Sequence, residues 1–184
     1  MKKTFAALLP AFFAFASLQA APQLIQCETK VDMRSASTED QGYITLSENG
    51  RSGKCFKITC PADRKGGILF HPWTQPMIKV ESASAPVKVT VWVKGKGRGS
   101  FGFLSYTRDK KIFYPPKTNT KFEVDSSDKW VKLELSYTPE AGKEYANKVG
   151  FIMPHISIES GSEILFDDLE TELTPPKNEI KIEE

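Results

Sequence analysis

Hydrophobic and polar residues alternate with a period of two along most of the chain. Every second residue of 87–94 is valine, and the positions between them are mostly polar. Residues 55–59 and 131–137 repeat this pattern with other apolar side chains. Because successive side chains of a strand point to opposite faces, each segment is predicted to be a half-buried strand. Further strands are expected at 24–31, 42–47, 67–71, 76–82, 100–107, 119–124, 148–158 and 162–173.

Residues typical of turns separate these segments. Gly66-Gly67, Gly95 to Gly99, Asp125 to Asp128 and Ser160-Gly161 each predict a reversal of the chain. Only 139–147 has the composition of a helical turn. About ten short strands at this spacing predict an all-β fold, a two-sheet jelly-roll β-sandwich.

The first 21 residues are predicted to be a signal peptide. Lys2 and Lys3 precede the apolar run Phe5 to Phe15, and small residues at Ala20 and Ala21 would permit cleavage. The run is too short to span a bilayer, which takes about 20 residues. A buried N-terminal helix is the alternative. We therefore expect an exported protein, periplasmic or extracellular, with one domain at 22–173 and a charged flexible tail at 174–184.

The charges of the expected mature chain balance. Lys2 and Lys3 are two of the 25 basic residues, so the remaining ones equal the 23 acidic residues in number. Nucleic acids and anionic membranes select strongly positive surfaces. Neither is therefore expected as a partner, and no second long apolar run predicts insertion into a membrane.

Three cysteines follow the predicted signal peptide, at Cys27, Cys55 and Cys60. An oxidising compartment would permit one disulfide. Cys55 and Cys60 are five residues apart in a strand-like segment and should face opposite ways. A bridge from Cys27 to one of them is therefore favoured, and three buried thiols are the alternative. Their spacing matches no zinc site.

Several short motifs occur in an order that resembles carbohydrate-binding modules. They are Cys27-Glu28, Gly50 to Lys54, Gln75-Pro76, Val91 to Gly95, Asp128 to Trp130 and Ile164 to Glu170. Together they cover about 24–173 and are similar to modules of the family four, nine and twenty-two type. This resemblance implies a galactose-binding-like jelly roll. It also implies that Trp92 and Trp130 pack as framework residues.

The same resemblance implies one structural calcium ion at the edge of the sandwich. Its ligands would be Glu28, backbone oxygens of Arg51 and Lys54, and Asp167. Calcium prefers six to eight hard oxygen ligands, which two carboxylates and carbonyl groups could largely supply. In the alternative, Asp167 faces solvent or is hydrogen-bonded by loop amides.

Aromatic residues near polar ones are the candidate ligand-binding residues. Sugar rings present C–H faces that stack on aromatic side chains, and their hydroxyl groups bond planar polar groups. Exposed aromatic side chains often mark binding surfaces. The candidates are Trp73, Gln75, Tyr106, Arg108, Phe113 and Tyr114. Core packing is the alternative for Trp73, Phe113 and Tyr114.

Signs of catalysis are poor. His71 and His155 lie in no metal-ligand pattern, and His155 is expected to be a satisfied or exposed strand residue. Glu123, Asp125 and Asp128 have the spacing of an acidic strand motif in jelly-roll glucanases, but Ser126-Ser127 indicates a turn between them. We expect a non-catalytic protein that binds an oligo- or polysaccharide. The alternative is an envelope module that binds a protein partner, or has only a structural role.

Overall fold

The computed structural model describes residues 23–29, 33–35, 37–72 and 77–174. No helix among these residues is long and apolar enough to cross a membrane. The elements, in chain order, are β1 (Gln23–Ile25), β2 (Met33–Ser35), the 3₁₀ helix η1 (Glu39–Tyr43), β3 (Ile44–Ser47), β4 (Cys55–Thr59), β5 (Ile68–Pro72), β6 (Ile78–Lys79), β7 (Val87–Thr107), β8 (Ile112–Phe113), β9 (Asn119–Tyr137), α1 (Glu144–Lys148), β10 (Val149–Ile158) and β11 (Glu163–Leu173).

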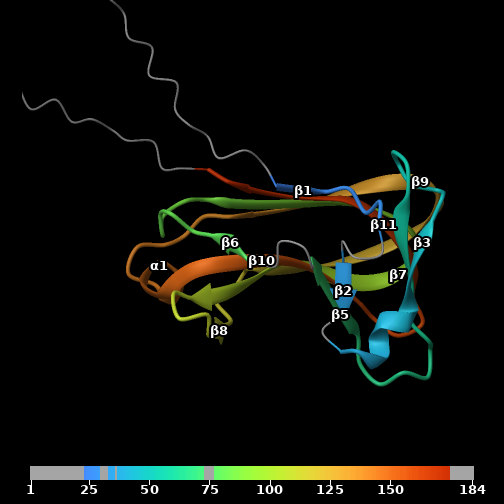
Figure 1. Ribbon diagram of the computed structural model, residues 1–184, viewed down its shortest axis with the longest axis horizontal. Helices are drawn as coiled ribbons and strands as arrows, with labels where there is room; N and C mark the ends of the chain where they lie inside the picture. The colour runs from blue at the N-terminus through green and yellow to red at the C-terminus, as the bar shows by residue number, and fades with distance from the viewer. Residues whose placement is uncertain (1–22, 30–32, 36, 73–76, 175–184) are drawn as a thin grey trace, which may run out of the picture.

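The strands form one curled antiparallel sheet whose two halves face each other (Figure 1). Half A contains β2, β5, β6, β8 and β10 together with 99–107 of β7 and 119–126 of β9. Half B contains β1, β3, β4 and β11 together with 87–96 of β7 and 131–137 of β9. The predicted all-β jelly roll is confirmed. Two long strands run through both halves.

The bend between the halves lies at Gly95, Gly97 and Gly99 of β7. The pairing of β7 with β9 shifts register between Val93 and Gly95. Gly95 and Gly97 have φ angles of 127° and 147°, which residues with a side chain rarely adopt. The predicted turns at 95–99 and 125–128 are therefore wrong. The glycines bend a continuous strand instead of reversing it, because the long β7–β9 pairing continues on both sides.

The core fills the space between the halves, as the alternation predicts. Val87, Val89, Val91 and Val93 are each at most 1% exposed. In the same half, the rings of Phe56 in β4 and Phe166 in β11 lie with their centroids 5.4 Å apart. Inward-facing residues of β5, β7 and β10 join the same cluster. Half A therefore buries one face in this core, and its other face remains available for a site.

Cys27, Cys55 and Cys60 are all buried thiols in the described part of the chain. The favoured disulfide from Cys27 is not formed. The thiols lie in different surroundings: Asp167 and Ser47 act on Cys55, whereas Arg64 and Ser160 act on Cys60. Burial is the main cause that raises the pKa of both thiols, so they behave as small core residues. The predicted helical turn is present as α1.

Replacing Gly95 with alanine should destabilise the protein by at least about 2 kcal/mol. The new Cβ would lie closer than 3.0 Å to the Glu163 carbonyl oxygen, and the φ angle of 127° would strain the residue. Urea unfolding would measure the loss. Gly42→Ala is the matched control, because nothing lies within 4 Å of its Cβ, and it should change stability by less than about 0.5 kcal/mol. Equal effects of the two substitutions would contradict the role of the bend.

Candidate functional site

An open groove of about 460 Å³ lies on the outer face of half A. Its volume is within the usual range for ligand pockets, about 300–1,000 Å³. Strands β5, β7 and β10 form its floor, and β8 and the start of β9 supply one side. The lining residues are Leu69, His71, Ser100, Leu104, Tyr106, Ile112, Tyr114, Asn119, Met153, His155 and Ser157.

Strand register places these side chains in rows across the sheet. His155 of β10 is paired with Gly102 of β7, and Gly102 is paired with Asn119 of β9. His71 follows Phe70, the partner of Ile156, so His71 lies beside His155 on the other side. The neighbouring rows contain Ser157 with Ser100 and Met153 with Leu104. Residues between these on each strand point into the core.

The groove has an apolar end and a polar end. Leu104, Met153, Tyr106, Ile112 and Tyr114 lie toward the β8 end. Asn119, Ser100, Ser157 and the two histidines lie toward the other end, with Leu69. None of these described lining residues is Asp, Glu, Lys or Arg. The groove can thus offer apolar contact and hydrogen bonds without a fixed charge.

His155 is a neutral side chain in the floor of the groove. It is 2% exposed, and its Nδ1 atom has no hydrogen-bond partner among the described residues. Burial, followed by the charge of His71, lowers the pKa of His155 from 6.5 to about 4. The expectation of a satisfied or exposed histidine is wrong. The alternation of β10 puts His155 on the groove face, and its neighbours cover it.

The structure brings only part of the predicted ligand-binding set into the groove. Tyr106 and the 72% exposed Tyr114 line it. Burial is the main cause that raises the pKa of Tyr106. Tyr114 is close enough to raise it further. Phe113 is 8% exposed and packs in the core, because alternation along β8 turns it inward while Ile112 faces out.

The other predicted ligand-binding residues lie elsewhere. Arg108 is exposed beyond the end of β7 and packs its backbone against Gly150, outside the lining. Trp73 and Gln75 lie outside the described residues.

Sequence reasoning missed the polar end of the groove. Its residues occupy the polar positions of strands with alternating apolar and polar residues, and such positions usually face solvent. They are His71, His155, Ser100, Ser157 and Asn119. Strand order decides which polar faces lie side by side, and β5, β10 and β7 are far apart in sequence. The available signal was that two histidines lie among the polar positions of apolar strands, where Lys, Glu and Thr are more usual.

The four predicted calcium ligands gather at one corner of half B. Asp167 is fully buried, and its carboxylate accepts hydrogen bonds from the amides of Arg51 at 2.8 Å, Ser52 at 3.5 Å and Asp168 at 2.8 Å. The carboxylate of Glu28 accepts the Lys54 amide at 3.3 Å to each oxygen. Burial is the largest influence on Asp167 and raises its pKa, whereas the Arg51 and Ser52 amides oppose the rise.

Arg51 completes this corner. Its guanidinium forms an ion pair with Asp168 and lies over the Trp92 ring, with 4.2 Å from Cζ to the ring centroid. Trp92 and Trp130 are half-buried and are not part of the core cluster; Lys94 lies over the Trp130 ring. Among the described residues, no three His, Cys, Asp or Glu side chains gather as a metal site. An ion bound here would therefore need carbonyl or water oxygens beside the two carboxylates, which is a donor set that calcium accepts.

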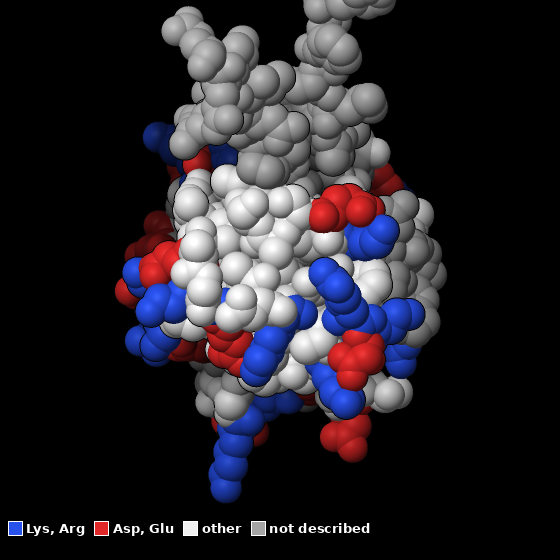
Figure 2. All heavy atoms as spheres, turned by 90° about the vertical axis from the view of Figure 1, so that its left-hand side faces the viewer, with Lys and Arg blue, Asp and Glu red and all other residues white. Residues whose placement is uncertain are grey.

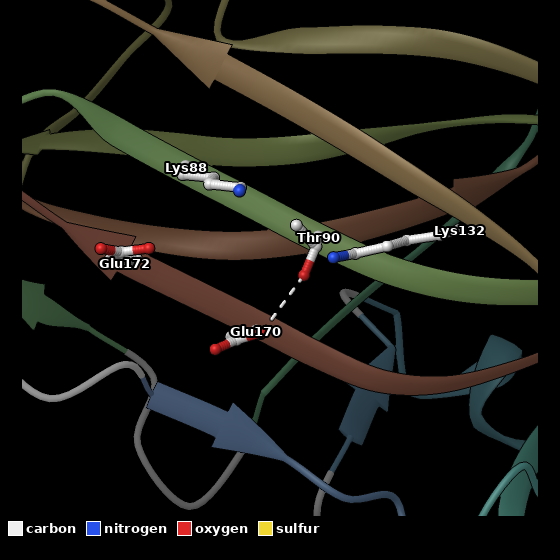
Figure 3. A pocket seen from close by; sticks show the side chains of 5 residues that line it. All are labelled: Lys88, Thr90, Lys132, Glu170 and Glu172. Atoms are coloured by element: carbon white, nitrogen blue, oxygen red, sulfur yellow. Dashed lines mark hydrogen bonds between the residues drawn. The ribbon is translucent and has the colours of Figure 1, made fainter.

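A second, smaller pocket of about 140 Å³ lies on the outer face of half B. Figure 3 shows its lining: Lys88 and Thr90 of β7, Lys132 of β9, and Glu170 and Glu172 of β11. The Thr90 hydroxyl donates to Glu170 at 3.5 Å, and Lys88 pairs with Glu134 at 3.1 Å. At least three polar groups of this pocket therefore already have partners within the chain.

Charged residues of both signs are interspersed on the surface. Figure 2 views the end of the molecule that carries α1, and shows an uncharged central area with basic and acidic side chains around it. Ion pairs of exposed residues, such as Lys79–Glu81 and Lys148–Glu144, join opposite charges. No single sign dominates this face.

Solved structures with a similar fold are mainly carbohydrate-binding modules. The xylan-binding CBM22-1 domain of Paenibacillus barcinonensis Xyn10C matches with a TM-score of 0.51 and 15% identity, over 84% of this chain and 94% of that chain. The family 11 module of Clostridium thermocellum Lic26A-Cel5E matches with a TM-score of 0.51 and 12% identity, over 85% and 95%. The active domain of bacteriophage CBA120 tailspike protein 4 matches at 0.55 and 11%, over 80% of this chain and 20% of that chain.

No family model matches the sequence, and no curated protein matches it. At these identities the structural matches establish the fold. The chain has the galactose-binding-like jelly roll found in carbohydrate-binding modules.

Acid should destabilise the protein through His155. Its pKa is about 4 in the folded state against an ordinary 6.5, so the unfolded state binds more protons between these pH values. Stability therefore falls as pH falls through this window, by about 3 kcal/mol for this residue. Urea unfolding at pH 7 and pH 4 should show a smaller loss in His155→Phe than in the wild type. An equal loss in both proteins would contradict the lowered pKa.

Proposed function

We propose that this protein binds a neutral oligo- or polysaccharide in the groove of half A. The observation that carries the proposal is the division of the groove into an apolar end with two tyrosines and an uncharged polar end. A sugar ring has the same division, because its C–H faces are apolar and its edge carries hydroxyl groups. The groove is open, so a chain of several sugars could lie along it.

The absence of fixed charge in the lining indicates a neutral ligand. A carboxylate or sulfate moved from water into the groove would lose hydration and meet no Lys or Arg among the described lining residues. A hydroxyl group needs only hydrogen-bond partners, which Asn119, Ser100 and Ser157 can provide.

Structural neighbours are in keeping with this proposal. The CBM22-1 module of Clostridium thermocellum Xyn10B was solved with its xylanase module in complex with xylohexaose. It matches this chain with a TM-score of 0.51 and 14% identity, over 81% of this chain and 28% of that chain. Fold likeness alone does not fix a ligand, so the chemistry of the groove carries the argument.

The proposed protein is exported and non-catalytic. Export rests on the Lys2-Lys3 start, the apolar run and the small residues before position 22. Tyr106 and Tyr114 would stack on sugar rings, and Trp73 follows β5 closely enough in sequence to remain a candidate. The groove offers no carboxylate pair for glycoside hydrolysis among its described lining residues.

Tyr114→Ala should weaken sugar binding by about 1–3 kcal/mol, because a stacking aromatic side chain is lost. Its 72% exposure means that folding should be unaffected. A glycan array with residues 22–184 would first identify a ligand among neutral β-1,4-linked glucose, xylose, mannose and galactose oligomers. Isothermal titration with the best oligomer would then measure the variant.

Trp130→Ala is the matched control, since it removes a half-buried aromatic residue outside the groove. It should leave affinity unchanged. If Tyr114→Ala and Trp130→Ala bind equally well, stacking by Tyr114 is wrong. If the folded wild type binds none of the glycans, the sugar proposal fails and a protein partner in the cell envelope becomes the better interpretation.

A structural calcium ion at the corner of Glu28 and Asp167 is a separate proposal. Two carboxylates converge on the loop 50–54, and the hydrogen bonds of Glu28 are long enough to leave its oxygens available to an ion. The ion would offset the negative charges of Glu28 and Asp167 and link β11 to the loop.

Calcium should raise the melting temperature if it binds the folded chain alone. At a calcium concentration one hundred times the dissociation constant, the gain in stability would be about 2.7 kcal/mol. Differential scanning calorimetry in calcium and in EDTA would measure it, with Glu28→Gln expected to reduce the difference. Identical melting temperatures in calcium and EDTA would remove the ion from this corner.

A further inference from the structure

His155 occupies a position that an apolar side chain would fill at lower energetic cost. It is 2% exposed in the middle strand of half A, yet its Nδ1 atom has no hydrogen-bond partner among the described residues. A buried polar atom without a partner is unfavourable by about 1–3 kcal/mol. Such an unpaired group at the floor of a groove indicates a partner supplied from outside the chain.

The groove that His155 lines is where that partner would bind. The neighbour of His155 in β7 is Gly102, which has no side chain. Beyond Gly102 in the same row is Asn119 of β9, and both Asn119 and His155 line the groove. The row therefore has two uncharged polar side chains with the buried Gly102 between them. Gly102 also has to be glycine, because its φ is 154° and a Cβ would meet the backbone of Thr118 closer than 3.0 Å.

We propose that His155 is a specificity-determining residue of the groove, which hydrogen-bonds a hydroxyl group of a sugar bound there. The neutral imidazole can either donate to or accept from that hydroxyl, and Asn119 can bond the same sugar from the other side. This inference rests on the proposed sugar binding and names the residue that selects among neutral sugars. Tyr106 and Tyr114, at the apolar end, would stack on the ring of any neutral sugar and so would discriminate less among these sugars.

The surroundings of His155 support its role as a hydrogen-bonding group for the sugar. His71 is close enough for its charge to lower the pKa of His155, after burial as the larger cause. Arg34 of β2 is paired with His71 in the next position of the row. Burial, and after it the charge of His71, keep His155 neutral near pH 7, the state in which one ring nitrogen can accept a hydrogen bond.

The test compares His155→Phe with Tyr114→Ala across the neutral β-1,4-linked glucose, mannose, galactose and xylose hexasaccharides. Mannose and galactose differ from glucose in the configuration of one carbon each, and xylose lacks the hydroxymethyl group, so a specificity residue changes their ranking. His155→Phe should weaken binding of the preferred hexasaccharide about 10- to 100-fold and reduce the differences among the four. Tyr114→Ala should weaken all four by similar factors.

Two further variants separate binding from folding. Tyr145→Phe removes another unpartnered buried polar group, in the core rather than the groove, and should leave affinity unchanged. His155→Asn keeps a short polar group at the site and should recover part of the lost affinity. Titrating ¹⁵N-histidine-labelled wild type with the preferred hexasaccharide should shift the His155 imidazole resonances, which tests the contact even if a variant fails to fold.

The outcomes separate the two proposals. A wild type that binds none of the hexasaccharides overturns the proposed function and this inference with it. A wild type that binds, with unchanged His155 resonances and unchanged ranking in a folded His155→Phe, overturns the inference alone. A shift of the His155 resonances together with a flattened ranking supports it.

Discussion

The continuity of β7 through its glycine bend is the constraint on which the rest of the fold depends. The same strand pairs with β11 before the bend and with β10 after it, and β9 accompanies it throughout. A side chain at Gly95 or Gly97 would collide with β11 or the turn before it. Because the strand crosses without interruption, the valines of its first part and the phenylalanines of its second part face one common core.

This continuity also determines what the groove contains. Once Phe101 and Phe103 face the core, Ser100, Gly102 and Leu104 must face outward. The register with β10 and β9 then places serine, histidine and asparagine side by side at one end and apolar residues at the other. The electrostatic character follows in part, because burial lowers the pKa of His155 and keeps this side chain of the floor neutral near pH 7.

Local patterns predicted most of the strands and the inward-facing residues, since alternation depends only on neighbours in the sequence. They failed at 95–99 and 125–128, where glycine and polar residues are common to turns and to bent strands, and only long-range pairing distinguishes the two. Local composition named Tyr106 and Tyr114 as candidates, and both line the groove. It did not name His155, because the burial of this side chain depends on packing between β5, β10 and β7. Phe113 was predicted to bind ligand, but in the two-residue strand β8 it faces the core, and its neighbour Ile112 faces outward.

The long strand β9 pairs with β7 alone among the described strands, so one edge of it stays open across both halves. Lys121, Glu123, Asp125, Lys129, Lys132 and Glu134 are exposed along it, with both signs of charge. An incoming strand from another copy would have to desolvate these charges to pair with the edge. Natural sequences use such charges to keep open strand edges from seeding aggregates. The surface of β9 thus lets many copies of the protein reach a high local concentration without joining into a continuous sheet.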